Sequence, residues 1–93
     1  MSYRVLLGEQ PREFLSDLDD KSEHIVKENL EKLGENPYPG EGKGDKEKLP
    51  VDGRVMYRLH IGRTYTAFYT IADDEVRVRE ILPIDDAHKK YGA

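Results

Sequence analysis

Apolar and polar side chains alternate along residues 54–60. Because successive side chains of a strand point to opposite faces, Val55, Tyr57 and Leu59 fall together on one face. The other face carries Arg54, Met56, Arg58 and His60. The pattern predicts a strand that buries one face in a core and presents a row of cations on the other.

Two further strands are predicted at 64–71 and 75–82. The first is rich in threonine and aromatic residues, and the second alternates valine with arginine. The connections between the three strands are short and contain turn-forming residues, Gly62 in one and Asp73 and Asp74 in the other. The three strands are therefore expected to form an antiparallel meander with 64–71 in its centre.

The first half of the chain predicts one strand followed by two helices. Residues 3–7 form an apolar, β-branched run expected near a sheet edge, and Pro11 suits the first turn of a helix. A second helix ends before Gly34, with Asp20 or Ser22 as its N-terminal cap. Apolar residues recur at helical spacing in both helices, which predicts a helix hairpin packed on one face of the sheet.

Together these elements predict an α+β fold with the order β-α-α-β-β-β. Residues 35–53 are rich in glycine, proline and charge and are expected to be a flexible loop without regular structure. Residues 84–93 are expected to be a short basic tail with about one helical turn. The length suits a single domain, 1–93, with one thin core.

The chain is acidic, with 15 Lys and Arg against 19 Asp and Glu, a net charge of −4 and a pI of about 5.3. The charge argues against binding of nucleic acid over the whole surface, although acids crowd the first half and arginines the second. The absence of cysteine excludes a disulfide framework and a Cys-ligated zinc site. We expect no cofactor or metal and, without a signal or membrane-spanning stretch, a cytoplasmic location.

The candidate chemistry lies in the cationic strand face and in the tail that ends at Tyr91. These residue types suit RNA cleavage without a metal, in which a base deprotonates a ribose 2′-OH, cations stabilise the phosphorane and an acid protonates the leaving oxygen. The alternative is a sheet with solvated arginines, and composition alone favours that alternative. The lysines of the expected loop are likewise typical of a solvated connector.

The segments 57–69 and 81–84, followed by the basic tail, resemble the RelE/ParE toxin superfamily over nearly the whole chain. The resemblance implies a helix hairpin on an antiparallel sheet. RelE-type members cleave mRNA in the ribosomal A site and are blocked by an antitoxin from the same operon. The implied function is a ribosome-dependent mRNA endoribonuclease, with a cognate antitoxin, the ribosome and mRNA as partners and no membrane or small-molecule cofactor.

The resemblance also implies roles for individual residues. Proton transfer and nucleotide positioning fall to Arg58, His60, His88 and Tyr91. Phosphate binding falls to Arg63 and Lys89. The charges of the strand face and of the expected loop add Arg54 and Lys48 as further candidates for phosphate binding.

The sequence departs from the family pattern at Thr66, where the family has an arginine, and at Asp86 and Ala87, near a second functional arginine or histidine. Two alternatives therefore stand beside the nuclease. One is a catalytically degenerate member that binds an antitoxin-like partner, and the other is a ParE-like gyrase inhibitor.

Overall fold

The computed structural model describes residues 2–39, 46–51 and 53–91. The elements are β1 (Arg4–Leu7), α1 (Glu9–Ser16), α2 (Asp20–Lys32), β2 (Lys46–Val51), β3 (Arg54–Ile61), β4 (Tyr65–Ala72), β5 (Glu75–Pro83) and α3 (Ile84–Tyr91). This order confirms the α+β class and the predicted sequence of strand, two helices and meander.

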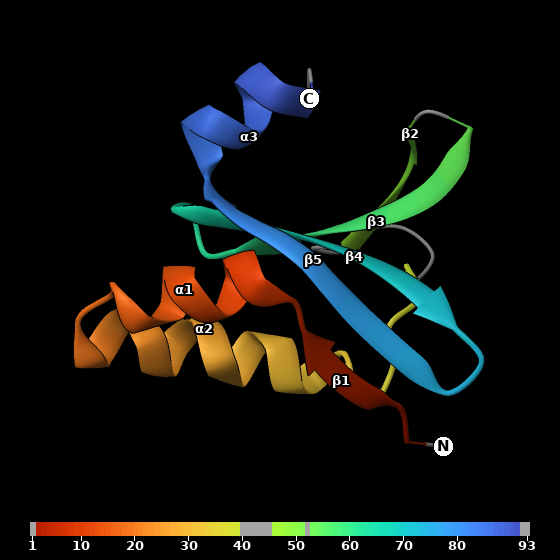
Figure 1. Cartoon of the computed structure of the whole chain (residues 1–93), viewed down its shortest axis with the longest axis horizontal. Coiled ribbons are helices and arrows are strands. Elements are labelled where there is room, and N and C mark those ends of the chain that lie inside the picture. Colours follow the sequence, from red (N-terminus) through yellow and green to blue (C-terminus); the bar gives the residue numbers. More distant parts are fainter. Residues whose placement is uncertain (1, 40–45, 52, 92–93) are drawn as a thin grey trace.

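The five strands form one sheet in the order β1-β5-β4-β3-β2. β1 runs parallel to β5, and the other neighbours are antiparallel. The predicted central strand is therefore confirmed as β4, and the first strand lies at an edge. α1 and α2 lie on one face of the sheet and α3 lies on the opposite face (Figure 1).

The prediction of a loop without regular structure over 35–53 is wrong for β2. This strand pairs with β3 at the sheet edge, where only one side of the strand needs ladder hydrogen bonds. An edge position tolerates Pro50, which has no N–H to donate, and edge lysines such as Lys48 discourage pairing with another chain. Residues 40–45 and 52, which also belong to the predicted loop, lie outside the described residues.

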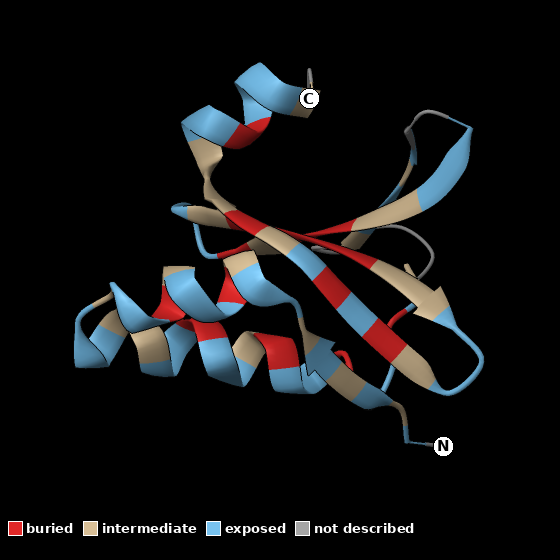
Figure 2. Cartoon of the chain, in the orientation of Figure 1, coloured by how far each residue is buried: buried red, intermediate tan, exposed pale blue. Residues whose placement is uncertain are grey.

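The core lies between the sheet and the α1–α2 hairpin. Its buried members are Leu15, Val26, Leu30, Leu33, Leu59, Ile61, Ala67, Tyr69, Val76, Val78 and Ile81. Buried and exposed residues alternate along β5 (Figure 2). Val55, predicted to share this face, is 50% exposed, because the β2–β3 end of the sheet curls away from the helices (Figure 1).

The end of α2 is held against β1. The Tyr3 N–H donates to the Gly34 carbonyl at 2.7 Å. A Cβ atom at Gly34 would lie only 3.2 Å from the carbonyl oxygens of Tyr3 and Glu31, so the close approach favours glycine. Gly34 thus follows the helix end as predicted. The N-cap of α2 is Asp19 rather than Asp20 or Ser22, and its side chain makes no capping hydrogen bond.

The predicted tail is a helix of eight residues, α3, which packs on the sheet face opposite α1 and α2. Its first N–H, at Ile84, donates to the Thr64 carbonyl at 2.9 Å. Ala87 is 1% exposed, which brings the helix backbone close to the sheet. Residues 92 and 93 of the predicted tail lie outside the described residues.

Candidate functional site

The candidate site lies on the sheet face opposite α1 and α2, which we call the outer face. Its side chains are Arg54, Met56, Arg58 and His60 of β3, Thr66, Phe68 and Thr70 of β4, and Arg77, Arg79, Glu80 and Leu82 of β5. α3 contacts β4 and β5 on this face. We call the part near α3, with Arg58, His60, Thr66, Phe68 and Glu80, the covered half. The rest, with Arg54, Met56, Thr70, Arg77 and Arg79, is the open half.

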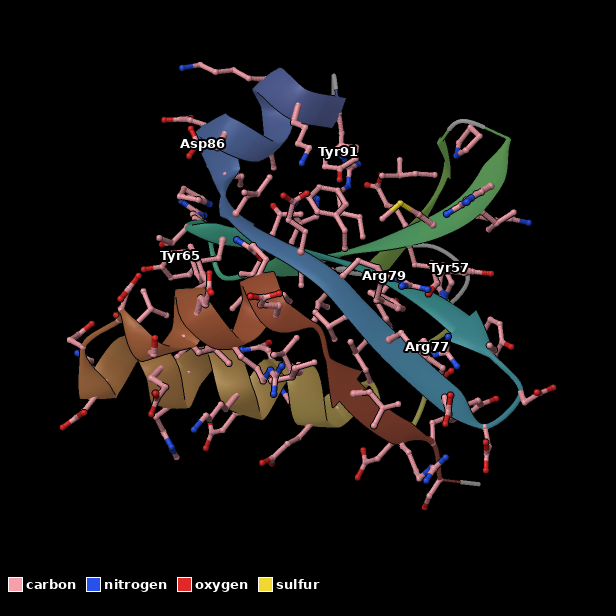
Figure 3. The ribbon with its side chains drawn as sticks, in the orientation of Figure 1. Tyr57, Tyr65, Arg77, Arg79, Asp86 and Tyr91 are labelled. Atoms are coloured by element: carbon pink, nitrogen blue, oxygen red, sulfur yellow. The ribbon has the colours of Figure 1, made fainter. Side chains whose placement is uncertain are left out.

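Tyr91 is held in the covered half by two neighbours. Its ring lies 4.1 Å from the fully buried Phe68 ring, centroid to centroid, and its hydroxyl donates to Glu80 Oε1 at 2.8 Å. Lys90 Nζ donates to both Glu80 oxygens, at 2.9 and 2.8 Å. Tyr91 points from α3 toward the sheet (Figure 3). The C-terminal helix is therefore fastened to the sheet through one carboxylate and one aromatic contact.

The same contacts change the acidity of the Tyr91 hydroxyl. Burial, followed by the hydrogen bond to Glu80 and the charge of that carboxylate, raises the pKa of Tyr91 to about 12. The phenol therefore stays protonated near neutral pH and donates its hydrogen to Glu80. Tyr91 offers its ring to a ligand more readily than its proton.

Arg58, predicted as an open cation, is buried and 7% exposed. Its guanidinium pairs with the half-exposed Glu47 of β2, which lies directly opposite it in the strand register. Arg58 Nε has no hydrogen-bond partner among the described residues. The expectation that Arg58 is a solvated cation is wrong, because Glu47 supplies a carboxylate from β2, a segment that the sequence predicted to be a loop.

His60 lies opposite Thr66 on the outer face and is half-buried. Thr66 is 1% exposed, and its hydroxyl has no partner in the part of the chain that the structure describes. Arg58, His60 and Tyr91 are thus brought to the same half of one face. This is the grouping that the sequence resemblance implies.

Other predicted residues lie elsewhere. Arg54 begins β3, whereas Arg63 lies in the turn beyond its other end, so the two are roughly 20 Å or more apart at about 3.3 Å per residue. Lys48 lies opposite Tyr57, on the face away from Arg58. His88 and Lys89 are exposed on α3, and Lys89 points away from the sheet because it is about 200° around the helix from the buried Ala87.

Sequence reasoning missed four residues of the outer face, namely Glu47, Arg77, Arg79 and Glu80. The alternation of Val76 and Val78 with the two arginines was a usable signal for Arg77 and Arg79. Glu47 was hidden in the expected loop. Glu80 has no local signal, because its role depends on contacts with α3, ten and eleven residues later.

Two of the three departures from the family pattern, Thr66 and Ala87, lie where α3 meets the sheet, and each is 1% exposed. The third, Asp86, is exposed on α3. An arginine in place of Thr66 or Ala87 would have to displace α3 or bury its charge. The small residues and the close packing of α3 are therefore parts of one arrangement.

Within the described ranges, no group of three His, Asp or Glu side chains is placed to hold a metal ion. No helix in the same part of the chain is long and apolar enough to cross a membrane.

No family model matches the sequence, and no curated protein matches it significantly. Solved structures do match. The archaeal RelE of the RelE–RelB complex from Pyrococcus horikoshii superposes with a TM-score of 0.72 and 28% identity, over 89% of this chain and 96% of that chain.

Two more distant structures share the fold. The YoeB dimer from Staphylococcus aureus has a TM-score of 0.66 and 22% identity, over 86% of this chain and 94% of that chain. The RelB–RelE antitoxin–toxin complex from Methanococcus jannaschii has a TM-score of 0.64 and 19% identity, over 94% of this chain and 99% of that chain. The archaeal RelE match, at 28% identity and nearly full coverage of both chains, supports a place for this chain in the RelE-like toxin superfamily, and the two more distant structures support the fold.

Proposed function

We propose that this chain is the toxin of a toxin–antitoxin pair and a ribosome-dependent mRNA endoribonuclease. The observation that carries the proposal is the end-to-end similarity, at 28% identity, to an archaeal RelE solved in complex with RelB. The expected partners are a cognate antitoxin, the ribosome and mRNA.

The proposed reaction needs no metal. The ribose 2′-oxygen attacks the adjacent phosphorus, the bond to the 5′-oxygen breaks, and the products are a 2′,3′-cyclic phosphate and a 5′-hydroxyl. A base takes the 2′-OH proton, a cation stabilises the added negative charge on phosphorus, and an acid returns a proton to the 5′-oxygen.

Two groups of the outer face suit the base. His60 is half-buried, and its neutral imidazole has a ring nitrogen that can accept a proton. Glu47 is half-exposed, and Arg58 holds its carboxylate in place. In this proposal Arg58 fixes Glu47 and contributes positive charge to the phosphate.

The remaining roles fall to α3 and the β3–β4 turn. Tyr91 orients the nucleotide through its ring, because its hydroxyl is occupied by Glu80. His88 acts as the acid, and Arg63 and Lys89 contact phosphates further from the cleaved bond. All three side chains are exposed and therefore accessible to a large substrate.

The test is induction of the protein in cells, followed by growth measurement and primer-extension mapping of messages. The wild type should arrest growth and give new 5′ ends within translated messages, and His60→Gln should reduce both. Arg12→Gln, an exposed change on α1, is the matched control and should behave as the wild type. Unchanged growth and intact messages on induction of wild type would contradict the proposal, and DNA damage without mRNA cleavage would indicate gyrase inhibition.

A second candidate is an antitoxin-binding member without catalysis. The observation that favours it is the covered half itself, where Thr66 and Ala87 replace larger residues and where Arg58 and Tyr91 are both bonded to carboxylates. This candidate predicts tight binding to the product of a neighbouring antitoxin gene with no effect of induction on messages.

A further inference from the structure

The open half of the outer face carries an excess of positive charge in an acidic protein. Four arginines lie there or at its margin, Arg4, Arg54, Arg77 and Arg79, and Glu75 is the carboxylate among them. The whole chain has a net charge of −4. The local surplus of cations is thus opposite in sign to the protein as a whole.

Glu75 neutralises only part of this charge. It accepts hydrogen bonds from both Arg4 and Arg77, and it is 18% exposed. The hydrogen bond from Arg77 is the main cause that lowers the pKa of Glu75, so the carboxylate is charged at neutral pH. One negative charge shared by two guanidinium groups leaves one positive charge in this trio.

Arg79 is oriented by a neutral group. Its Nε donates to the Thr70 hydroxyl at 3.2 Å, and its terminal amino groups have no partner among the described residues. The β4–β5 register shifts between Phe68 and Tyr69, and Arg79 is the extra residue of β5 at this bulge. The bulge places Arg79 and Glu80 on the same face, with Arg79 toward Thr70 and Glu80 toward Tyr91.

The arginines are arranged in a line that leads to the aromatic pair of the covered half. Arg77 and Arg79 are two residues apart on one strand, which separates their Cα atoms by roughly 6.6 Å. Both project from the part of β5 away from α3 (Figure 3). Beyond Arg79 lie Phe68 and Tyr91, whose rings contact each other. A cationic track beside aromatic side chains is the arrangement that binds single-stranded nucleic acid without regard to sequence.

We propose that Arg77 and Arg79, with Arg54 at the margin, bind the phosphate backbone of a single RNA strand that reaches Tyr91 across the open half of the sheet. This inference rests on the proposed function for the identity of the strand as RNA. An acidic peptide fits less well, because a nucleic-acid strand supplies one charge per residue at even spacing together with bases for the half-buried Tyr91 ring, which Phe68 supports from beneath.

The experiment measures binding of a fluorescein-labelled, ten-nucleotide, unstructured RNA by fluorescence anisotropy at several salt concentrations. The RNA is 2′-O-methylated throughout, so it lacks the attacking hydroxyl and cannot be cleaved. The proteins are the full chain, Arg77→Gln with Arg79→Gln, the corresponding double lysine variant, and Arg12→Gln as the control. Each phosphate contact on a single strand contributes about 0.7 to the slope of log K against log salt.

The double glutamine variant should lower the salt slope by about 1.4, which corresponds to two lost phosphate contacts. The lysine variant should recover most of the slope, because it keeps the charges, and Arg12→Gln should leave the slope unchanged. Circular dichroism should show the same fold for all variants, because the changed residues are exposed.

An unchanged slope in the double glutamine variant, or an equal loss in Arg12→Gln, would overturn the proposal. Loss of polyglutamate binding in the double variant while the RNA slope stays the same would also overturn it and would identify a protein-docking face. The proposed function fails separately. If the double glutamine variant changes RNA binding as expected but induction leaves messages intact, the proposed nuclease activity is wrong and the proposed RNA-binding surface is still supported.

Discussion

The covered and open halves of the outer face contain similar side chains and differ in how their charges are satisfied. In the covered half, Glu47 neutralises Arg58, and Glu80 bonds to both Lys90 and Tyr91. In the open half, Arg77 shares one carboxylate with Arg4, and the one side-chain bond of Arg79 among the described residues is to a threonine. Burial explains the difference, because a charge removed from water needs a partner and an exposed one does not.

The comparison separates two tasks on one sheet face. In the covered half, hydrogen bonds hold Tyr91 to Glu80 and Arg58 to Glu47, which is the kind of preorganisation that the proposed reaction needs. The open half leaves cations available for a long, charged ligand. Changes in the covered half should therefore alter stability strongly, and changes in the open half should alter binding with little effect on stability.

The largest effect is expected for Phe68→Ala. Phe68 is fully buried and supports the Tyr91 ring, so its removal should lower the free energy of unfolding by about 3–5 kcal/mol. Urea denaturation gives this value, and hydrogen exchange should show loss of protection in α3. Thr70→Ala, on the same strand in the open half, is the control, with an expected change of about 0.5 kcal/mol or less. Comparable losses in both variants would remove the distinction between the halves.

Thr66→Arg should also be strongly destabilising. The site is 1% exposed beneath α3, so the longer charged side chain must displace the helix or be buried without a partner, at a cost of roughly 2–4 kcal/mol. Denaturant titration measures the loss. Although the family has an arginine here, we expect no gain in RNA cleavage. A stable variant with higher RNA-cleavage activity would show that α3 is easily displaced from the sheet.

Glu47→Gln tests the buried ion pair. The substitution keeps an acceptor for Arg58 but removes the charge, and the expected loss is roughly 1–2 kcal/mol because Glu47 itself is half-exposed. If Glu47 is the base, the rate of RNA cleavage should fall by much more than the loss of folded protein explains. If His60 is the base, the rate should fall only as far as the fraction of folded protein falls.

Tyr91 should carry a pH signature. Burial and Glu80 raise the pKa of Tyr91 to about 12, from a usual value near 10 in the unfolded chain. The contribution of Tyr91 to the free energy of unfolding is therefore fully present below pH 10. It is lost as the pH rises from 10 to about 12, because the unfolded chain loses this proton first. Urea denaturation at pH 9 and pH 11 should show that the free energy of unfolding falls less between these pH values for Tyr91→Phe than for the wild type. The remaining loss includes Tyr69 and Tyr3, whose pKa values burial also raises.

Glu80→Gln sharpens the same measurement. Ultraviolet titration of tyrosine ionisation should show a lower pKa for Tyr91 in this variant, still above the usual value, because burial is the larger cause and survives the change. A Tyr91 pKa that does not move would show that Glu80 does not hold the hydroxyl.

The smallest effect on stability is expected in the open half. Arg79→Gln should change the free energy of unfolding by no more than the roughly 0.5 kcal/mol typical of exposed positions, since among the described residues Arg79 donates to the Thr70 hydroxyl alone. Differential scanning calorimetry checks this. A loss near that of Phe68→Ala would mean that Arg79 supports the fold and would weaken its assignment to a ligand.

Much of the fold follows from local patterns that are independent of long-range contacts. The alternation in β3, β4 and β5, the short turns between them and the apolar spacing of α1 and α2 predicted the meander and the helix hairpin. β2 was missed because it lies at the sheet edge and pairs with one neighbouring strand only. An edge strand tolerates proline, lysine and glutamate, and these residues are also typical of loops. The absence of β2 from the prediction made Arg58 look solvated.

The covered half depended on tertiary structure. Strict alternation from Val76 and Val78 places Glu80 in the core, yet one extra residue at the bulge turns it to the outer face beneath Tyr91. Side-chain alternation is a property of one strand and is visible in the sequence. The register between strands, and the helix that closes over them, are set by contacts between distant segments. The sequence by itself therefore determined four of the five strands and the helix hairpin, and the tertiary structure added β2 and decided which charges of the sheet are buried and which are exposed.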